Sequence, residues 1–352
     1  MMNLKECLER IEAVDSGLEE KIQKKLDNLT KPPGSLGRLE ELAKQYCMIK
    51  NTLSPELKNK VIFTLAGDHG VTEEGVSAFP KEVTPQMVYN FLRGGAGINV
   101  LAGHVGARVV VADLGVACDL ETHPGLIIKK INYGTKNMAK EPAMTREEAV
   151  KSIEAGIEIF EHEYKKGIDI VGTGDMGIGN TTSSTAITAA ITGKEVEKLT
   201  GRGTGINSEM FENKIRVIKK SLELNLPDAE DAIDVLSKVG GFEIGGLCGV
   251  ILASAAAKVP VLIDGFISGA AALLAYKLEP KVKDYLIAAH CSVEQGHKIV
   301  LEYLGLVPLL DLNLRLGEGT GAALGMSIVE SGVKILNEMA TFESAGVTDK
   351  ND

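Results

Sequence analysis

The sequence predicts an α/β fold built on a parallel sheet with helices on both faces, and two observations carry this prediction. Short apolar runs recur through the middle of the chain, each ends in Gly or a polar residue, and helix-like patterns separate them. Such alternation is typical of parallel sheets, whose strands are apolar because helices cover both of their faces. The 39 glycines among 352 residues also fit many tight turns between strands and helices.

The apolar runs give the expected strands in order. They are residues 61–66, 108–112, 168–171, 259–263, 285–289 and 308–310. Ligands of open parallel sheets bind at the carboxyl ends of the strands. Gly, Asp, His and Glu residues follow these runs, so we expect the functional site at that edge.

Helix signals between the runs support the alternation. Thr84 followed by Pro85 predicts a helix with Thr84 as N-cap and Pro at the first helical position. Asn180 is the expected N-cap of a helix that continues through residues 181–191. After Gly321, apolar residues recur every three or four positions, as in an amphipathic helix.

The two chain ends predict a small helical unit. Residues 1–50 are helical in pattern apart from an interruption at 31–34, and the end of the chain is helical too. We therefore expect an α/β domain over residues 55–321 and a small helical domain formed by residues 1–54 and 322–352.

Composition excludes several classes of function. The formal net charge of −10 and the absence of Trp argue against general nucleic-acid binding. The five cysteines are scattered without C-x-x-C spacing or a nearby His, so we expect no metal site. The start of the chain has no signal-peptide pattern and no apolar run is long enough to span a membrane, which predicts a cytoplasmic protein.

The glycine-rich segment 172–182 is the most informative motif. It lies between an apolar run and a helix-prone run, the layout that binds phosphate through backbone N–H groups. Asp175 inside it would repel a phosphate, so we expect this acid to face another part of the ligand. A simple tight turn is the alternative interpretation.

The same segment matches the G-x-G-x-x-G dinucleotide fingerprint, which also requires an acid about 20 residues further on at the end of a strand. The acids at that distance, Glu195 and Glu197, lie in a polar stretch that does not predict a strand. A mononucleotide or sugar phosphate is therefore favoured over a nicotinamide dinucleotide.

Three further groups of residues are candidates for chemistry. Glu318, within the glycines of 317–321, is either a general base or an acid that stabilises a helix start. The pair Asp68–His69 could serve catalysis or bind a metal, but we favour a structural role as a hydrogen-bonding turn. Segment 201–206 with Lys214 and Arg216 is either a phosphate site or a solvated basic face.

Several long motifs together resemble one enzyme family. They are residues 29–39, 66–71, 75–80, 83–87, 174–182, 201–205 and 317–321, with 339–342 near the end. In this order they are similar to the nicotinate-nucleotide–dimethylbenzimidazole phosphoribosyltransferases of cobalamin lower-ligand assembly.

The resemblance implies transfer of ribose 5-phosphate from nicotinate mononucleotide to 5,6-dimethylbenzimidazole, giving α-ribazole 5′-phosphate and nicotinate. It also implies a Rossmann-like sheet, a small helical domain, a homodimer and no cofactor. Glu318 corresponds to the catalytic base and Lys214 to the lysine near the donor. Ser77, Phe79, Gln86 and Leu316 correspond to the lower-ligand pocket.

The donor site is expected on backbone groups of the two glycine segments. The residues assigned to it are Gly174, Gly177, Ile178, Gly179, Asn180, Thr181 and Gly203. Asp175 is the second catalytic candidate, orienting the ribose or the path of the proton. Relatives often carry Glu at its position, so the shorter arm argues against a direct proton relay.

The chemistry of this reaction agrees with the residues. Nicotinate leaves the ribose as a neutral ring, so no general acid is needed, and the benzimidazole nitrogen attacks C1′. Glu318 then accepts the proton from the other ring nitrogen, a general-base role that contributes about 10²–10⁴-fold. A non-catalytic mononucleotide sensor and a nucleotide-dependent oxidoreductase are the alternatives.

Overall fold

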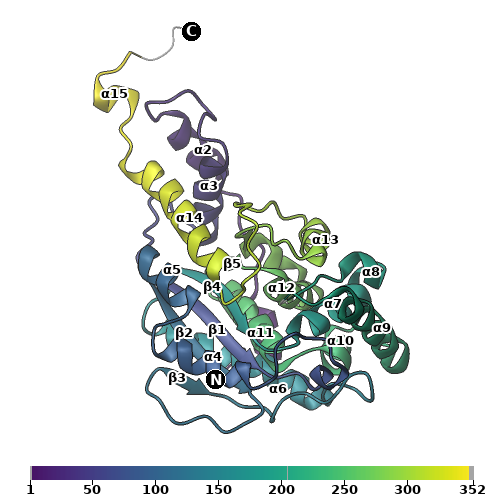
Figure 1. Ribbon diagram of the computed structural model, residues 1–352. Coiled ribbons are helices and arrows are strands. Elements are labelled where there is room, and N and C mark those ends of the chain that lie inside the picture. The colour runs from purple at the N-terminus through teal and green to yellow at the C-terminus, as the bar shows by residue number, and fades with distance from the viewer. Residues whose placement is uncertain (1, 204, 349–352) are drawn as a thin grey trace.

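The computed structural model describes residues 2–203 and 205–348 and contains one six-stranded parallel sheet (Figure 1). Its strands are β1 (Lys60–Gly67), β2 (Ala107–Gly115), β3 (Leu126–Ile128), β4 (Ile170–Met176), β5 (Val261–Ile263) and β6 (Leu286–Ala288). They lie in the order β3-β2-β1-β4-β5-β6, and all neighbouring pairs are parallel. The predicted α/β fold is confirmed.

Helices cover both faces of the sheet. The longer helical elements are α1 (Leu4–Arg10), α2 (Glu19–Asp27), α3 (Arg38–Lys50), α4 (Val83–Leu92), α5 (Gly97–Val105), α6 (Arg146–Tyr164), α7 (Asn180–Thr192), α9 (Ser208–Asn225), α10 (Ala232–Val239), α11 (Phe242–Ala256), α12 (Phe266–Leu278), α13 (Gln295–Leu304) and α14 (Thr320–Glu338). The short ones are α8 (Val196–Leu199), α15 (Phe342–Ala345) and the 3₁₀ turns η1 (Gly70–Glu74) and η2 (Pro280–Tyr285).

Alternation along β1 divides the core into two layers. Val61, Phe63 and Leu65 pack into one cluster, which includes α6, α11 and α12. Ile62 and Ala66 point the other way and pack with α4, α5 and α14. Because successive side chains of a strand face opposite sides, a strand that is buried along its whole length, such as β1, requires helices on both faces of the sheet.

The helical unit at the chain ends differs in one respect from the prediction. Helices α2, α3 and α15 with the end of α14 form the projection at the top of Figure 1, and Leu26, Cys47 and Leu336 share a separate small core there. Helix α1 instead packs on α6 and α11, with Cys7 in the sheet core. Helix α14 runs from the sheet into the projection, so the proposed boundary at residue 322 falls within a continuous helix.

The structure corrects the extent of two predicted strands. The predicted strand 168–171 corresponds to β4, which continues to Met176. Gly172 and Gly174 therefore belong to β4, and only residues 177–179 form the turn. The run 308–310 forms no strand, because only Leu310 makes a bridge, to His290. A loop, and not a strand, therefore leads to Glu318.

Two predicted helix starts are also wrong. Helix α4 begins at Val83, so Thr84 lies inside its first turn, where its hydroxyl accepts a hydrogen bond from Ile178 N at 3.1 Å. Helix α7 begins at Asn180 itself, and the N-cap is Gly179 in the left-handed conformation. Both polar side chains serve the site instead of their own helix.

Within residues 2–203 and 205–348, no helix has the length and apolar character needed to cross a membrane. In the same part of the chain, no group of three or more His, Cys, Asp or Glu side chains is arranged to hold a metal ion.

Candidate active site

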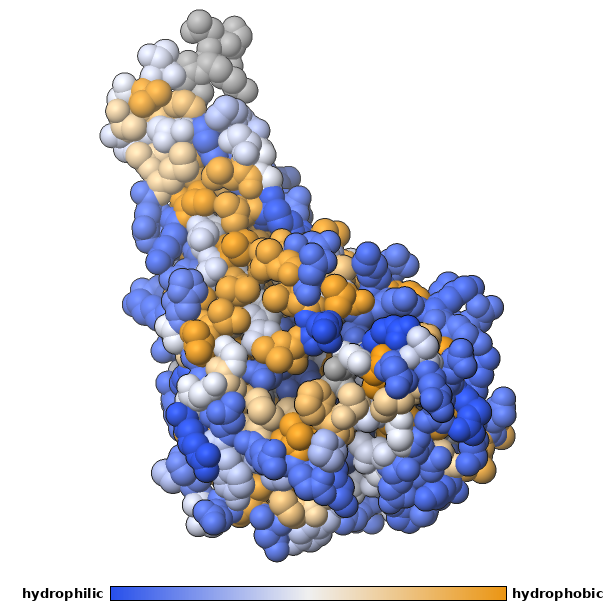
Figure 2. Space-filling model, in the orientation of Figure 1, coloured by the Kyte–Doolittle hydropathy of each residue, from blue (hydrophilic) through white to orange (hydrophobic). Residues whose placement is uncertain are grey.

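A cavity of about 440 Å³ opens at the carboxyl ends of β4, β5 and β6. Its lining residues are Phe79, Val83, Met87, Asp175, Met176, Gly177, Ile178, Asn180, Thr181, Gly203, Gly265, Ile267, His290, Ser292, Glu294, Arg315, Leu316, Gly317 and Glu318. Figure 2 shows hydrophobic residues along α14 and around the hollow in the middle of the visible face. The cavity is therefore largely apolar and carries a few carboxyl groups in its wall.

The backbone around Glu318 is held in an unusual conformation. Gly317, Glu318 and Gly319 have φ values of 79°, 63° and 97°. The Thr64 hydroxyl donates to the Glu318 carbonyl at 2.9 Å, and the Ile98 N–H donates to Glu318 Oε2 at 3.0 Å. Both the backbone and the carboxylate of Glu318 are fixed by these contacts.

The surroundings of Glu318 favour a stronger base than an ordinary carboxylate. Burial and the nearby charge of Asp264 raise the pKa of Glu318, and the hydrogen bond from Ile98 opposes that rise. A general base works best when its pKa approaches the working pH. Glu318 thus has the position and the electrostatics of a group that accepts a proton from a ligand in the cavity.

Asp175, on β4, lies next to the Glu318 loop: a Cβ on Gly317 would stand 3.3 Å from Asp175 Oδ2. It is buried, its Oδ2 accepts from Asn180 Nδ2 at 2.9 Å, and its Oδ1 has no protein partner among the described residues. Burial raises the pKa of Asp175 well above its usual value, and the charges of Asp264, Glu243 and Glu318 raise it further. The neutral form is favoured, so Asp175 can donate a hydrogen bond into the cavity.

A smaller cavity of about 40 Å³ adjoins the first at the start of α7. Its lining residues are Val76, Ser77, Gly177, Ile178, Gly179, Asn180, Thr181, Arg202, Gly203 and Lys214. The N–H groups of the first turn of a helix attract anions, and Lys214 adds a positive charge beside them. This arrangement suits a phosphate group.

Lys214 does not lie on a solvated face. Its side chain is only 1% exposed, and Nζ donates to Thr181 Oγ1 at 2.8 Å. Burial lowers the pKa of Lys214 to about 8, and the charge of Glu294 acts in the opposite direction. Arg216, by contrast, is exposed and donates to Asn213 on its own helix.

Most of the site residues predicted from the sequence meet in these two cavities, but two of them do not. Gln86 lines neither cavity and is exposed on α4. Gly174 lies inside β4, where a Cβ would stand 2.2 Å from the Glu318 carbonyl oxygen. Gly174 therefore allows the Glu318 loop to approach the strand and is not part of a phosphate loop.

Sequence reasoning missed several residues of the site. His290 and, just behind the wall, Asp264 are apparent in the sequence only as polar residues that follow strands. Their position at strand ends was the available signal. Glu294, Val83 and Met87 carried no such signal, because they lie on a loop and on a helix face that only the tertiary fold directs to the cavity.

Asp68 and His69 form the hydrogen-bonding turn that we favoured. The His69 side chain is buried completely, with Nε2 2.7 Å from Glu243 Oε1 and Nδ1 3.0 Å from Ser183 Oγ. Asp68 accepts from Ala117 N at 2.8 Å. The pair therefore supports the strand ends without facing the cavity.

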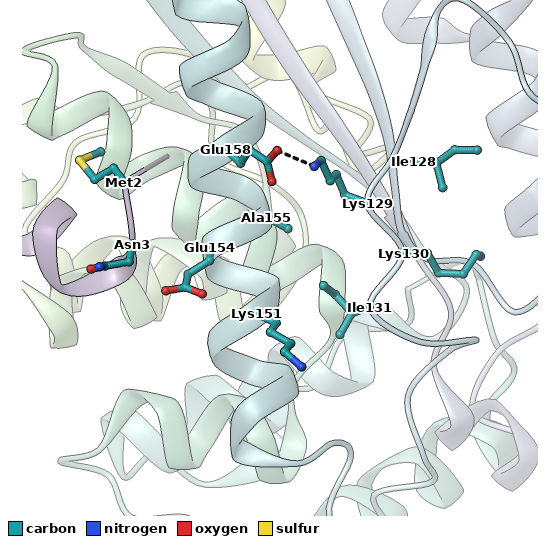
Figure 3. A pocket seen from close by; sticks show the side chains of 10 residues that line it. All are labelled: Met2, Asn3, Ile128, Lys129, Lys130, Ile131, Lys151, Glu154, Ala155 and Glu158. Carbon is teal, nitrogen blue, oxygen red and sulfur yellow. Dashed lines mark hydrogen bonds and ion pairs between the residues drawn. The ribbon is translucent and has the colours of Figure 1, made fainter.

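A second large cavity, of about 570 Å³, lies between α6 and the segment after β3 (Figure 3). Three of its charged groups are engaged in ion pairs: Lys129 and Glu158 pair with each other at 2.5 Å, and Lys130 pairs with Asp113 at 2.8 Å. Among the described residues, the strand ends bring together buried carboxyl groups and a buried cation, and this second cavity does not. We therefore place the activity at the strand ends.

Comparison with known proteins agrees with this site. A family model described as phosphoribosyltransferase matches residues 11–347. A protein of Geobacter sulfurreducens named nicotinate-nucleotide–dimethylbenzimidazole phosphoribosyltransferase is 59% identical over 349 residues, which are 99% of each chain. The chain belongs to this family of phosphoribosyltransferases.

Further relatives support the family. A protein of the same name from Citrifermentans bemidjiense is 59% identical over 98% of each chain. The crystal structure of CobT from Thermus thermophilus superposes with a TM-score of 0.91 at 45% identity, covering 94% of this chain and 99% of that one. The resemblance inferred from the motifs is confirmed.

Proposed function

We propose that this protein transfers ribose 5-phosphate from nicotinate mononucleotide to 5,6-dimethylbenzimidazole, giving α-ribazole 5′-phosphate and nicotinate. The observation that carries the proposal is the junction of two cavities, one suited to a phosphate and the other apolar with a buried base. The names of the full-length relatives give the same substrates.

The donor phosphate is placed at the start of α7. The backbone N–H group of Thr181 in the first turn of α7 and the ammonium of Lys214 supply the positive potential there. The chain is acidic overall, so this local concentration of donors is what selects a doubly charged ligand. Charge-assisted hydrogen bonds of this kind are worth about 1.5–3 kcal/mol each.

The acceptor base is placed in the apolar part of the larger cavity. Phe79, Met87 and Leu316 supply flat or flexible apolar surface, and Glu318 lies at the edge of this region. A planar bicyclic ring with one N–H group fits this chemistry, because its faces bury apolar area while its N–H meets the carboxylate.

The reaction then needs few protein groups. The ring nitrogen of the benzimidazole forms a bond to C1′ as the bond to nicotinate breaks, and nicotinate leaves as a neutral ring. The excess proton on the other benzimidazole nitrogen passes to Glu318. Asp175, in its neutral form, donates a hydrogen bond that orients the ribose. Holding both reactants in line supplies up to about 7–11 kcal/mol of the barrier reduction.

The assembly state belongs to the same proposal. Phe79 is 50% exposed and Leu316 is 60% exposed at the rim of the cavity. Exposed apolar side chains in a group are unusual on a monomer and favour association. We propose a homodimer, a cytoplasmic location and activity without a metal or other cofactor.

One experiment separates this function from its alternatives. The purified protein is incubated with nicotinate mononucleotide and 5,6-dimethylbenzimidazole, and free nicotinate is measured by chromatography. The proposal expects nicotinate release only when both substrates are present. A nucleotide sensor would bind the donor without release, and an oxidoreductase would require a redox partner that this assay does not contain.

A further inference from the structure

Asp264 lies directly after β5 and joins the loop of Glu318 to the sheet. Its side chain is buried completely. Asp264 Oδ2 accepts from Gly319 N at 3.2 Å, and Oδ1 accepts from Ala322 N at 2.9 Å. These N–H groups form the start of α14, whose own N-cap, Gly319, has no side chain to satisfy them. Asp264 thus caps this helix from a neighbouring strand.

The backbone conformation of the Glu318 loop requires hydrogen bonds that hold it in place. A residue other than Gly at positive φ costs about 1–3 kcal/mol and persists only where its surroundings fix it. Glu318 has a φ of 63° between two glycines that are also left-handed. Thr64 holds the carbonyl of Glu318, and Asp264 holds the next N–H group. The peptide that follows Glu318 is therefore anchored from two different strands.

Asp264 is itself held in place from several sides. Its backbone N–H donates to Thr173 Oγ1 on β4 at 3.2 Å. His290 Nε2 lies 3.7 Å from Asp264 Oδ1. A Cβ on Gly321 would lie 2.0 Å from His290 Cδ2 and 2.8 Å from Asp264 Oδ1, so the helix approaches this pair as closely as its backbone allows.

We propose that Asp264 is a positioning residue for the catalytic base: it fixes the left-handed loop of Glu318 and places a negative charge behind it. This inference rests on the proposed function, because Glu318 is a base only in that reaction. Asp264 lines neither cavity, so it acts through residues that do; besides holding the Glu318 loop, its charge raises the pKa of Asp175.

The charges around the loop make the effect measurable. Burial raises the pKa of Glu318, and the charge of Asp264 raises it further. Burial also raises the pKa of Asp264 itself, whereas His290 and the backbone N–H groups at the start of α14 act in the opposite direction and favour its ionised form. The other charged or titratable groups that face this region are Asp175 on β4, Glu243 on α11, His290 after β6 and Arg315 on the loop itself. Helix α5 and strand β1 contribute the neutral Ile98 N–H and Thr64 hydroxyl.

The sign of the pH effect follows from the role of the base. Glu318 accepts a proton only when it is ionised, so kcat falls as the pH drops through its pKa. Removal of the charge of Asp264 lowers that pKa, because a like charge no longer opposes ionisation. The acidic limb of the kcat profile therefore moves to lower pH.

Asp264→Asn tests the proposal, with Asp113→Asn as the matched control. Asp113 follows the same pattern at the end of β2: it is buried completely and accepts from Gly115 N at 3.0 Å and Val116 N at 2.8 Å. We expect Asp264→Asn to lower kcat about tenfold or more, because small misplacements of catalytic groups are costly. Its KM values should stay within about twofold, and its acidic limb should move down by about half a pH unit or more.

Thr173→Val separates position from charge. It keeps the carboxylate of Asp264 but removes the acceptor of its backbone N–H group. We expect a lower kcat with an unmoved acidic limb. If Asp264→Asn fails to fold, this variant carries the test, and a wild-type kcat in it would overturn the proposal.

The contrary results are distinct from a failure of the proposed function. A folded Asp264→Asn protein with the kcat and acidic limb of the wild type would overturn the inference. So would an equal fall in kcat in Asp113→Asn, which would indicate a general loss of structure. Absence of nicotinate release by the wild-type protein would overturn the proposed function, and this inference with it.

Discussion

The two glycine-rich segments of this protein each place one carboxyl group among glycines, yet they use the glycines differently. In segment 172–182, Gly174 belongs to a regular strand and leaves room for a neighbouring backbone. In segment 317–321, Gly317 and Gly319 adopt positive φ and let the chain turn in a left-handed path around Glu318. The strand part of the first segment needs a small residue at Gly174, whereas the second segment, like Gly179 in the turn after β4, needs conformational freedom.

The different positions of the two segments affect the pKa values of their two acids. Asp175 stands on β4, deep in the sheet edge, where burial and neighbouring carboxylates raise its pKa strongly. Glu318 stands on a loop between the sheet and α14, where the Ile98 N–H group still hydrogen-bonds its carboxylate. In the proposed reaction the two acids of this cavity therefore have different roles, Asp175 as a neutral hydrogen-bond donor and Glu318 as the base.

The largest effect is expected at the base. Glu318→Gln keeps the size and the hydrogen-bond acceptor of the side chain but cannot take up a proton. We expect kcat to fall by about 10²-fold or more with little change in the Kd of nicotinate mononucleotide. Steady-state nicotinate release and donor calorimetry on the same preparation measure both. Near-normal turnover would remove Glu318 from the role of base.

The packing role of the first segment is tested by Gly174→Ala. The added Cβ would stand 2.2 Å from the Glu318 carbonyl oxygen, so either the strand or the Glu318 loop must move. We expect a loss of about 1–3 kcal/mol in the free energy of unfolding, together with a fall in kcat. Denaturant titration and nicotinate release measure the two effects.

Gly103→Ala is the matched control for that change. Gly103 is an exposed residue of α5 with nothing within 4 Å of an added Cβ. The substitution should raise stability by about 0.4–1 kcal/mol and leave kcat unchanged. If Gly174→Ala behaved in the same way, the close approach of strand and loop would have no functional meaning.

The donor phosphate is expected to bind between the turn that follows β4 and Lys214 of α9. Lys214→Ala should weaken binding of nicotinate mononucleotide about tenfold or more, since a charge-assisted contact is lost. Because the pKa of Lys214 lies at about 8 in the free protein, wild-type affinity should also decline as the pH rises through that value. Donor calorimetry at several pH values tests both expectations.

Arg216→Ala provides the comparison for Lys214. It removes an exposed cation from the same helix, α9, without altering the small cavity. We expect a donor Kd within about twofold of the wild type at moderate salt, because exposed charges are screened. Equal losses in the two variants would mean that Lys214 acts only through the general potential of the helix.

Apart from the two control variants, the smallest effect is expected for Asp175→Asn, whose side chain resembles the neutral acid. The pKa of Asp175 is higher in the folded protein than in the unfolded chain. The contribution of Asp175 to stability is therefore fully present below the unfolded-state pKa and is lost as the pH rises through the folded-state pKa. The variant should therefore gain Tm relative to the wild type at pH 8 more than at pH 5, with a modest fall in kcat. A Tm difference that is independent of pH would mean that Asp175 is ionised in the folded protein.

The sequence predicted the parts of the fold that depend on local pattern. The apolar runs that became β1, β2, β5 and β6 were visible because each is short, apolar and closed by Gly or a polar residue. The extension of β4 was hidden, because glycines normally indicate a turn. The run before Asp311 looked like a strand but lies beyond the sheet, where only one bridge forms.

The candidate site shows the same division. Glu318, Asp175 and Lys214 could be selected from the chain because glycines flank the two acids and a glycine loop precedes the lysine. Gln86 was selected from the resemblance alone, and the helix that carries it turns the side chain to solvent. Nothing in the local pattern indicated that Glu294 would accept from Gly203 N at 3.0 Å.

By itself, the sequence determined the alternation of strands and helices, the edge at which the site lies and the family to which the chain belongs. Only the tertiary structure decided which carboxyl groups meet, because Asp175, Asp264 and Glu318 come from three distant segments. Their mutual distances depend on strand order and on how closely α14 packs against the sheet. Those distances and the loss of solvent decide how far the pKa of each acid is raised, since a pKa responds to burial and to nearby charge.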